Sequence, residues 1–112
     1  MGGGTGSGLG SLILSKVAEE YSNKLAFNFS IFPESANKNS STSDVVVEPY
    51  NAIFSIQALI ESSSADFVLE NAALYRICTQ TLKEAHPTFA DINYIVAQAM
   101  SNTTSSLRFP GI

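Results

Sequence analysis

Gly2-Gly3-Gly4-Thr5-Gly6-Ser7-Gly8 is the stretch that decides the fold, because six of the seven glycines lie within the first ten residues. So permissive a backbone predicts a loop rather than the interior of a helix or strand. Large apolar residues then recur at helical spacing and predict a helix: Leu9, Leu12, Ile13, Val17 and Tyr21. A glycine run that feeds a helix lets backbone N–H groups converge on one anion, which favours a phosphate loop over residues 1–10.

The rest of the chain alternates predicted strands and helices. Residues 25–32 alternate with period two, and residues 66–70 read as a short buried strand. Helices are expected over 50–60, over 74–82 and over 88–106, the last beginning at an N-cap Thr88 and weakened by its final Ser/Thr/Asn run. Residues 34–44 form a polar loop, and Val45 to Val47 offer a short extended stretch. This order predicts a parallel α/β layer, with a further strand expected before the glycine run.

Composition excludes several classes of function. The 112 residues are 45% apolar and only 14% charged, so the chain is expected to be ordered and to pack part of its apolar surface against other protein. The net charge is −4 and lysine and arginine do not cluster, which argues against nucleic acid or a membrane as a partner. The single cysteine, Cys78, forms no internal disulfide and is expected to be an inert buried thiol in a cytoplasmic protein.

The glycine spacing excludes two familiar nucleotide motifs. No placement of G-x-G-x-x-G fits these glycines, and no Gly-Lys-Ser/Thr follows them as a P-loop requires. Three functions are weighed from the residues alone. They are a nucleotide-binding domain, an interaction segment with a flexible Gly/Ser tail, and a dinucleotide-binding oxidoreductase of Rossmann type, which this glycine spacing disfavours.

The glycine run resembles the tubulin signature GGGTGSG. Further blocks similar to tubulins follow in order: Val46 to Asn51, Asn71 to Tyr75, Ile77-Cys78 and Pro87 to Phe89. Residues 107–111, Leu-Arg-Phe-Pro-Gly, are similar to the β-tubulin version of their segment. The resemblance implies that residues 1–112 are a fragment of the Rossmann-like, parallel-sheet N-terminal GTP-binding domain, ending in the long core helix. Departures such as Glu70, Ala72 and Arg76 suggest a divergent member.

The resemblance also implies a set of GTP-binding residues. The phosphate loop would contribute Gly3, Gly4, Thr5, Gly6, Ser7 and Gly8, and the sugar-contacting loop, residues 33–49, would contribute Asp44 and Glu48. Asn71 and Asn93 match the asparagines that read guanine, and Phe89 matches the aromatic residue that stacks on the base. Without the resemblance, caps or exposed polar positions would better explain the two asparagines, and core packing would better explain Phe89.

The implied function is that of a β-tubulin-like cytoskeletal subunit that binds GTP or GDP and polymerises with α-tubulin into microtubules. Tubulins hydrolyse GTP, but the resemblance places the hydrolytic residues and the Mg²⁺ ligands outside these 112 residues. No catalytic residue is therefore expected within them.

Overall fold

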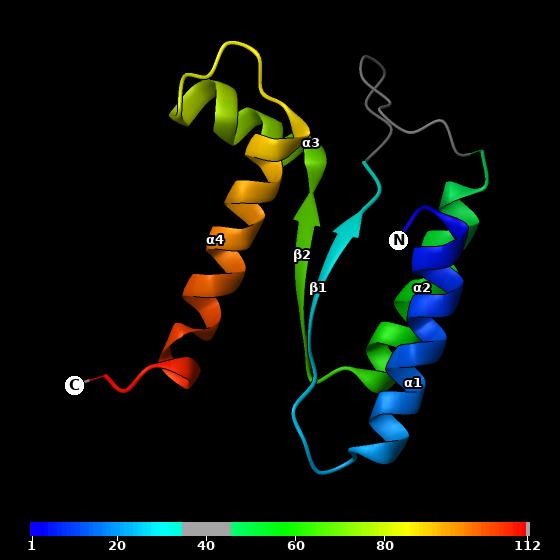
Figure 1. Ribbon diagram of the computed structural model, residues 1–112. Coiled ribbons are helices and arrows are strands. Elements are labelled where there is room, and N and C mark those ends of the chain that lie inside the picture. The colour runs from blue at the N-terminus through cyan, green and yellow to red at the C-terminus, as the bar shows by residue number, and fades with distance from the viewer. Residues whose placement is uncertain (35–45, 112) are drawn as a thin grey trace. The chain divides into compact units, whose positions relative to one another are not determined.

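The computed structural model describes residues 1–34 and 46–111, which divide into two compact units, Met1–Glu70 and Asn71–Ile112 (Figure 1). The first unit contains a π-helical turn η1 (Thr5–Leu9), α1 (Gly10–Glu20), β1 (Phe27–Phe32), α2 (Glu48–Ser62) and β2 (Ala65–Glu70). The second contains α3 (Asn71–Arg76), a π-helical turn η2 (Ile77–Thr81) and α4 (Phe89–Arg108). The predicted α/β class and the order of its elements are confirmed.

Strands β1 and β2 form a parallel pair joined by α2. Their register sets Phe29 opposite Phe67, and the two rings stack with centroids 4.4 Å apart and planes 7° from parallel. At the amino end of β1 the Asn28 amide donates to the hydroxyl of Ser63 over 2.7 Å. A one-residue slip would separate the stacked rings and turn them to opposite faces of the sheet, so these side chains specify the register.

Helices α1 and α2 lie side by side in the first unit (Figure 1). The part of the η1–α1 helix that packs inward carries small or half-buried side chains at helical spacing: Ser7, Ser11, Leu14 and Ala18. From α2, Ala52, Ser55 and Leu59 are buried. Small side chains let the two helix backbones approach closely, which is the reason the interior of this unit contains serines.

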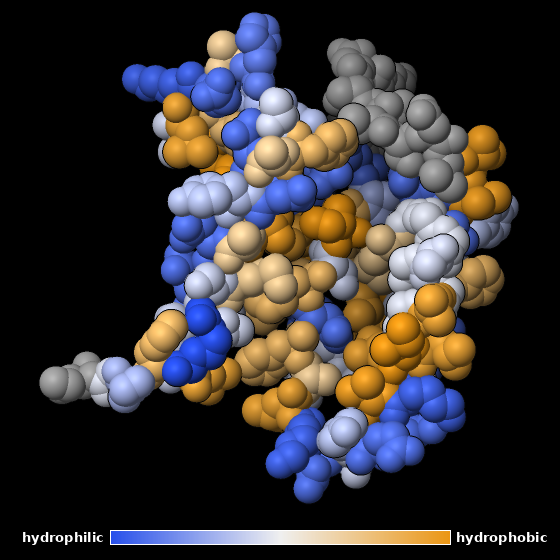
Figure 2. Space-filling view, in the orientation of Figure 1, coloured by the Kyte–Doolittle hydropathy of each residue, from blue (hydrophilic) through white to orange (hydrophobic). Residues whose placement is uncertain are grey.

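Leu12, Ile13 and Val17, unlike Leu14, lie on the outer side of α1. Leu12 is 57% exposed and Ile13 53% exposed, and Figure 2 shows hydrophobic side chains along the surface of α1 that faces the viewer. The spacing predicted the helix correctly, but α1 buries none of its residues in the described part of the chain. This agrees with the expectation, taken from the low charge, of apolar surface that packs against other protein.

The second unit has its own small core. Leu74 of α3, Cys78 of η2 and Ile92 of α4 are buried against one another, with Tyr75, Ile95 and Val96 packed around them. Cys78 is 0% exposed and its thiol is free, as the apolar spacing predicted. The thiol is packed against Ile92 and is removed from solvent. A buried apolar environment of this kind makes a cysteine unreactive.

Local hydrogen bonds set the ends of α4. The Asp91 carboxylate accepts from the backbone N–H of Thr88 over 2.8 Å and from its hydroxyl over 2.7 Å. At the other end, Arg108 donates to the carbonyl oxygen of Ser101 over 2.7 Å and lies over the ring of Phe109. The helix therefore starts as predicted at Thr88 but continues two residues past 106, because Arg108 ties its last two turns together.

One predicted extended stretch is wrong in its described part. Val46 and Val47 lie in a turn, and Val47, with φ −89° and ψ 9°, caps the start of α2. Pro49 follows in the first turn of that helix, where its missing N–H costs no hydrogen bond. Because α2 begins at Glu48 directly after this turn, the backbone at Val46 and Val47 does not continue as a strand.

Candidate functional site

The glycine run is the start of a helix rather than a loop. Gly4 has φ −65° and ψ −47°, and Thr5–Leu9 form the π-helical turn that continues into α1. The backbone N–H of Ser7 donates to the carbonyl of Gly3 over 3.1 Å and closes the first turn. The prediction of a loop was therefore wrong beyond Gly3. That prediction rested on the permissive backbone of glycine, but Gly4 has right-handed helical angles and no described glycine has a positive φ.

The glycines instead leave space above the helix start. A Cβ added to Gly3, Gly4, Gly6 or Gly8 would meet no described atom within 4 Å. Glycine in a helix costs about 1 kcal/mol relative to alanine. Neither backbone conformation nor crowding by the described residues explains why glycine occurs there. The remaining physical reason for glycine is that, without a side chain, another group can approach the backbone closely.

The same turn presents unpaired backbone donors. When the first closed bond of a helix runs from Ser7 to Gly3, the N–H groups of residues 3–6 have no carbonyl on a preceding turn. Those groups carry the positive end of the helix dipole. The start of the η1–α1 helix thus combines several N–H donors, partial positive charge and open space, which is the arrangement that binds phosphate groups.

Glu48 lies beside the glycine run. It is the first residue of α2, and its Cγ and Cδ atoms lie 2.7 and 2.8 Å from where a Cβ on Gly2 would be. Any side chain at residue 2 would therefore push Glu48 away. The structure thus brings one residue predicted to contact the sugar close to the predicted phosphate loop, whereas Asp44 lies outside the described residues.

The remaining predicted residues, Asn71, Phe89 and Asn93, belong to the second unit. Asn71 is the first residue of α3 and is half-buried. Phe89 and Asn93 are exposed on α4 at a spacing of four residues, so they share one face of that helix. The Phe89 ring makes an edge contact with Tyr75 of α3, with centroids 6.5 Å apart. This contact positions Phe89 at the start of α4 with most of its ring uncovered.

Two residues that the sequence did not single out hold the glycine run in place. Asn51 donates from its side-chain amide to the carbonyl of Gly2 over 2.8 Å, and Ser55 donates to the hydroxyl of Ser7 over 2.7 Å. Both lie on α2, one turn apart. The sequence pattern that could have indicated these two residues is a spacing of four, between Asn51 and Ser55 and between Ser7 and Ser11. This spacing places small polar side chains on one face of each helix.

Within the part of the chain that the structure describes, no three His, Cys, Asp or Glu side chains come together as a metal site would require. Among these same residues, no helix combines the length and the apolar character needed to cross a membrane. The hydroxyl and the backbone N–H of Thr88 hold the pKa of the Asp91 carboxyl below its usual range.

Comparison with known proteins agrees with this geometry. Residues 1–79 match the family model of the Tubulin/FtsZ family, GTPase domain. The chain is 50% identical over 111 residues to the tubulin beta-6 chain of Gallus gallus, an alignment that covers 99% of this chain and 24% of that protein. The chain thus spans about a quarter of the length of this relative. With a glycine run at a helix start, a βαβ unit and matches over most of its length, the chain belongs to the Tubulin/FtsZ family and corresponds to a stretch of its GTPase domain.

Proposed function

We propose that this chain supplies the nucleotide-binding surface of a tubulin-like cytoskeletal subunit that binds GTP and GDP. The full protein would assemble with α-tubulin into microtubules in the cytoplasm. The family match to a GTPase domain and the identity to a β-tubulin support this function. Both matches are to the tubulin family, and neither favours the dinucleotide-dependent oxidoreductase.

One observation carries the proposal: an uncovered glycine backbone at the positive end of a helix. Gly3, Gly4, Gly6 and Gly8 have open space where their Cβ atoms would be, and the helix closes its first turn only at Ser7. The run contains no lysine or arginine, so backbone amides would supply the hydrogen bonds to the phosphate oxygens. Guanine nucleotides are the phosphate ligands that the family implies.

The other predicted contacts complete the proposed site. Glu48, and Asp44 outside the described residues, would accept hydrogen bonds from the ribose hydroxyls. Asn71 and Asn93 would each donate and accept on the edge of the guanine, and Phe89 would stack on the base. The exposed ring of Phe89 and the exposed side chain of Asn93, one turn apart on α4, suit this role. The ligands of Mg²⁺ and the residues that position the attacking water are proposed to lie outside these 112 residues.

The proposal is tested by nucleotide competition on the full-length protein stripped of its nucleotide. A fluorescent GTP analogue is titrated first and then displaced with GTP, GDP, ATP or NAD. We expect GTP and GDP to displace it at far lower concentrations than ATP or NAD. Displacement by NAD but not by GTP would reject the proposal.

An Asn93→Ala variant adds a test of the base contact. Loss of a base-edge hydrogen bond should weaken GTP by about tenfold while leaving ATP unchanged. Assembly is tested separately, by light scattering with purified α-tubulin. Scattering that rises with GTP but not with GDP is the expected outcome, and equal scattering with both would contradict the proposed role in polymerisation.

A further inference from the structure

The side chains that fix the shape of the glycine run come from α2. Three oxygen atoms lie in a triangle beneath the run: the hydroxyls of Ser7 and Ser55 are 2.7 Å apart, and they lie 3.1 and 2.7 Å from the carbonyl oxygen of Asn51. Ser7 is 6% exposed and Ser55 3% exposed. This triangle crosses 44 residues of sequence to join η1 to the second and third turns of α2.

Counting protons shows that the triangle depends on Ser55. Linking three oxygen atoms takes two hydrogen bonds, and the two hydroxyls have one proton each. All three oxygens are therefore linked only when both hydroxyls donate within the triangle. Without the Ser55 hydroxyl, Ser7 keeps a single bond of 3.1 Å to α2. The complete triangle holds Ser7 against two oxygen atoms of α2 instead of one, so it favours one position of Ser7.

Ser7 is committed to this anchoring role. Its backbone N–H donates to Gly3, its carbonyl accepts from the Ser11 hydroxyl over 2.5 Å, and its own hydroxyl faces α2. The uncovered donors of the run therefore belong to its neighbours, whose positions follow that of Ser7. On the Gly2 side, the Asn51 amide fixes the carbonyl of Gly2 in the same way.

We propose that Ser55 and Asn51 are positioning residues of the phosphate site, which hold the glycine run so that its amides converge on the phosphates. This inference rests on the proposed GTP binding. Because Glu48 starts the helix that carries both residues, α2 also links the phosphate contacts to the proposed sugar contact. Ordinary helix packing would account for the burial of Ser55. It would not make binding of the phosphates depend on Ser55 and Asn51 more strongly than binding of the nucleoside does.

The test therefore separates phosphate binding from binding of the nucleoside. Affinities for GTP and for guanosine are measured by competition on the full-length protein and its Ser55→Ala variant. Loss of the triangle should weaken GTP by about tenfold, the effect of one phosphate hydrogen bond that a displaced run no longer makes, and leave guanosine unchanged. Ser62→Ala, which removes a hydroxyl from the far end of the same helix, is the matched control and should leave both affinities unchanged.

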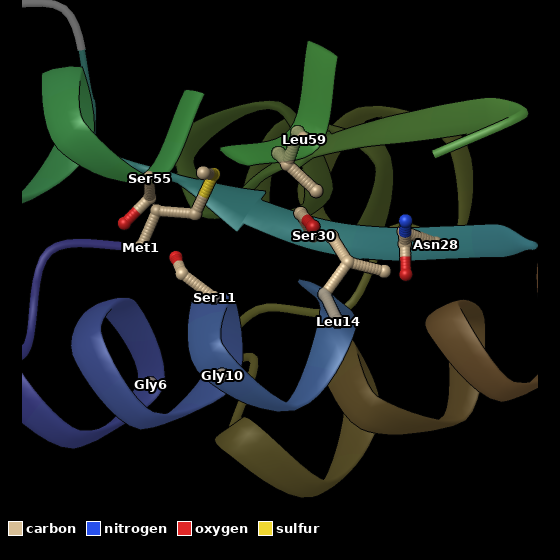
Figure 3. A pocket seen from close by; sticks show the side chains of 9 residues that line it. All are labelled: Met1, Gly6, Gly10, Ser11, Leu14, Asn28, Ser30, Ser55 and Leu59. Carbon is tan, nitrogen blue, oxygen red and sulfur yellow. The ribbon is translucent and has the colours of Figure 1, made fainter. Parts of the chain in front are cut away.

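A conservative variant gives the rescue. Ser55→Thr keeps the hydroxyl and adds one methyl group beside a cavity of about 180 Å³ that Ser55 lines together with Ser11 and Leu14 (Figure 3). The variant should therefore bind GTP within about threefold of the wild type, since the added methyl has space and the buried hydrogen bonds remain. Asn51→Ala, which removes the side-chain hydrogen bond to Gly2 and improves helix propensity, should show the same selective loss as Ser55→Ala.

The outcomes are distinct. Equal weakening of GTP and guanosine in Ser55→Ala would assign the serine to general packing and overturn the inference, and so would a Ser55→Ala protein that matches Ser62→Ala. If circular dichroism shows that Ser55→Ala is unfolded, Asn51→Ala decides, and unchanged GTP affinity there overturns the inference. A wild-type protein that binds no GTP would instead reject the proposed function, and this inference with it, before any variant is compared.

Discussion

Replacing Gly4 by alanine should stabilise the protein and weaken its nucleotide binding at the same time. Gly4 has helical backbone angles, and a Cβ there meets no described atom within 4 Å. Alanine restricts the unfolded chain more than glycine does, so a compatible substitution of this kind stabilises by about 0.4 to 1 kcal/mol. The new methyl group, however, occupies the space through which we propose that a phosphate approaches the backbone.

The expected loss of affinity follows from the same geometry. If the methyl group displaces the phosphate from one backbone amide, the protein loses one hydrogen bond to a charged group, worth about 1.5 to 3 kcal/mol. This corresponds to a dissociation constant for GTP that is roughly 10 to 150 times higher. The effects on stability and on binding therefore have opposite signs, which a general disturbance of the fold would not produce.

Gly10 provides the matched control. It has nearly the same backbone angles, φ −60° and ψ −42°, and its Cβ position is equally open, but it is not one of the predicted GTP-binding residues, which in this run end at Gly8. Gly10→Ala should stabilise the fold to a similar extent and leave GTP affinity unchanged. Stability is measured by denaturant unfolding without nucleotide, because bound GTP would itself stabilise the folded state. Unchanged GTP affinity in Gly4→Ala, or equal losses in both variants, would refute the reasoning.

Two further predictions concern the second unit. The pKa of Asp91 is lowered by the two hydrogen bonds from Thr88, so the stability that the carboxylate gives to α4 is present above its unfolded pKa and is lost as the pH falls through its folded pKa. Circular dichroism between pH 7 and acid should show this loss in the wild type and a smaller one in Asp91→Ala; identical profiles would contradict the cap. Ile92 is 2% exposed against Leu74 and Cys78, so Ile92→Val should destabilise by about 0.5 to 1.5 kcal/mol and Ile92→Ala by about 2 to 5 kcal/mol. Chemical denaturation checks this order, and a cost below 1 kcal/mol for alanine would show that Ile92 is not part of a packed core.

The sequence by itself determined most of the helices and strands, and it indicated the family. Period-two alternation located β1, the spacing of Ile53, Ile56 and Leu59 located α2, and Thr88 marked the start of α4, because these signals depend only on neighbouring residues. The GGGTGSG run indicated the tubulin family, which the comparisons showed. Local sequence is sufficient here because each signal reflects steric and hydrogen-bonding preferences within one or two turns.

Only the tertiary structure decided which faces pack and what the glycines do. Periodicity showed that Leu12, Ile13 and Val17 belong to one helix, but their outward position follows from the small side chains that α1 presents to α2. The triangle formed by Ser7, Ser55 and Asn51 joins residues 44 or more positions apart, a distance over which no local pattern carries information. The glycine run was expected to act through its conformational freedom. In the folded chain the backbone of the run is helical from Gly4 onward. What the glycines provide is a helix start without side chains above it, which α2 holds in place.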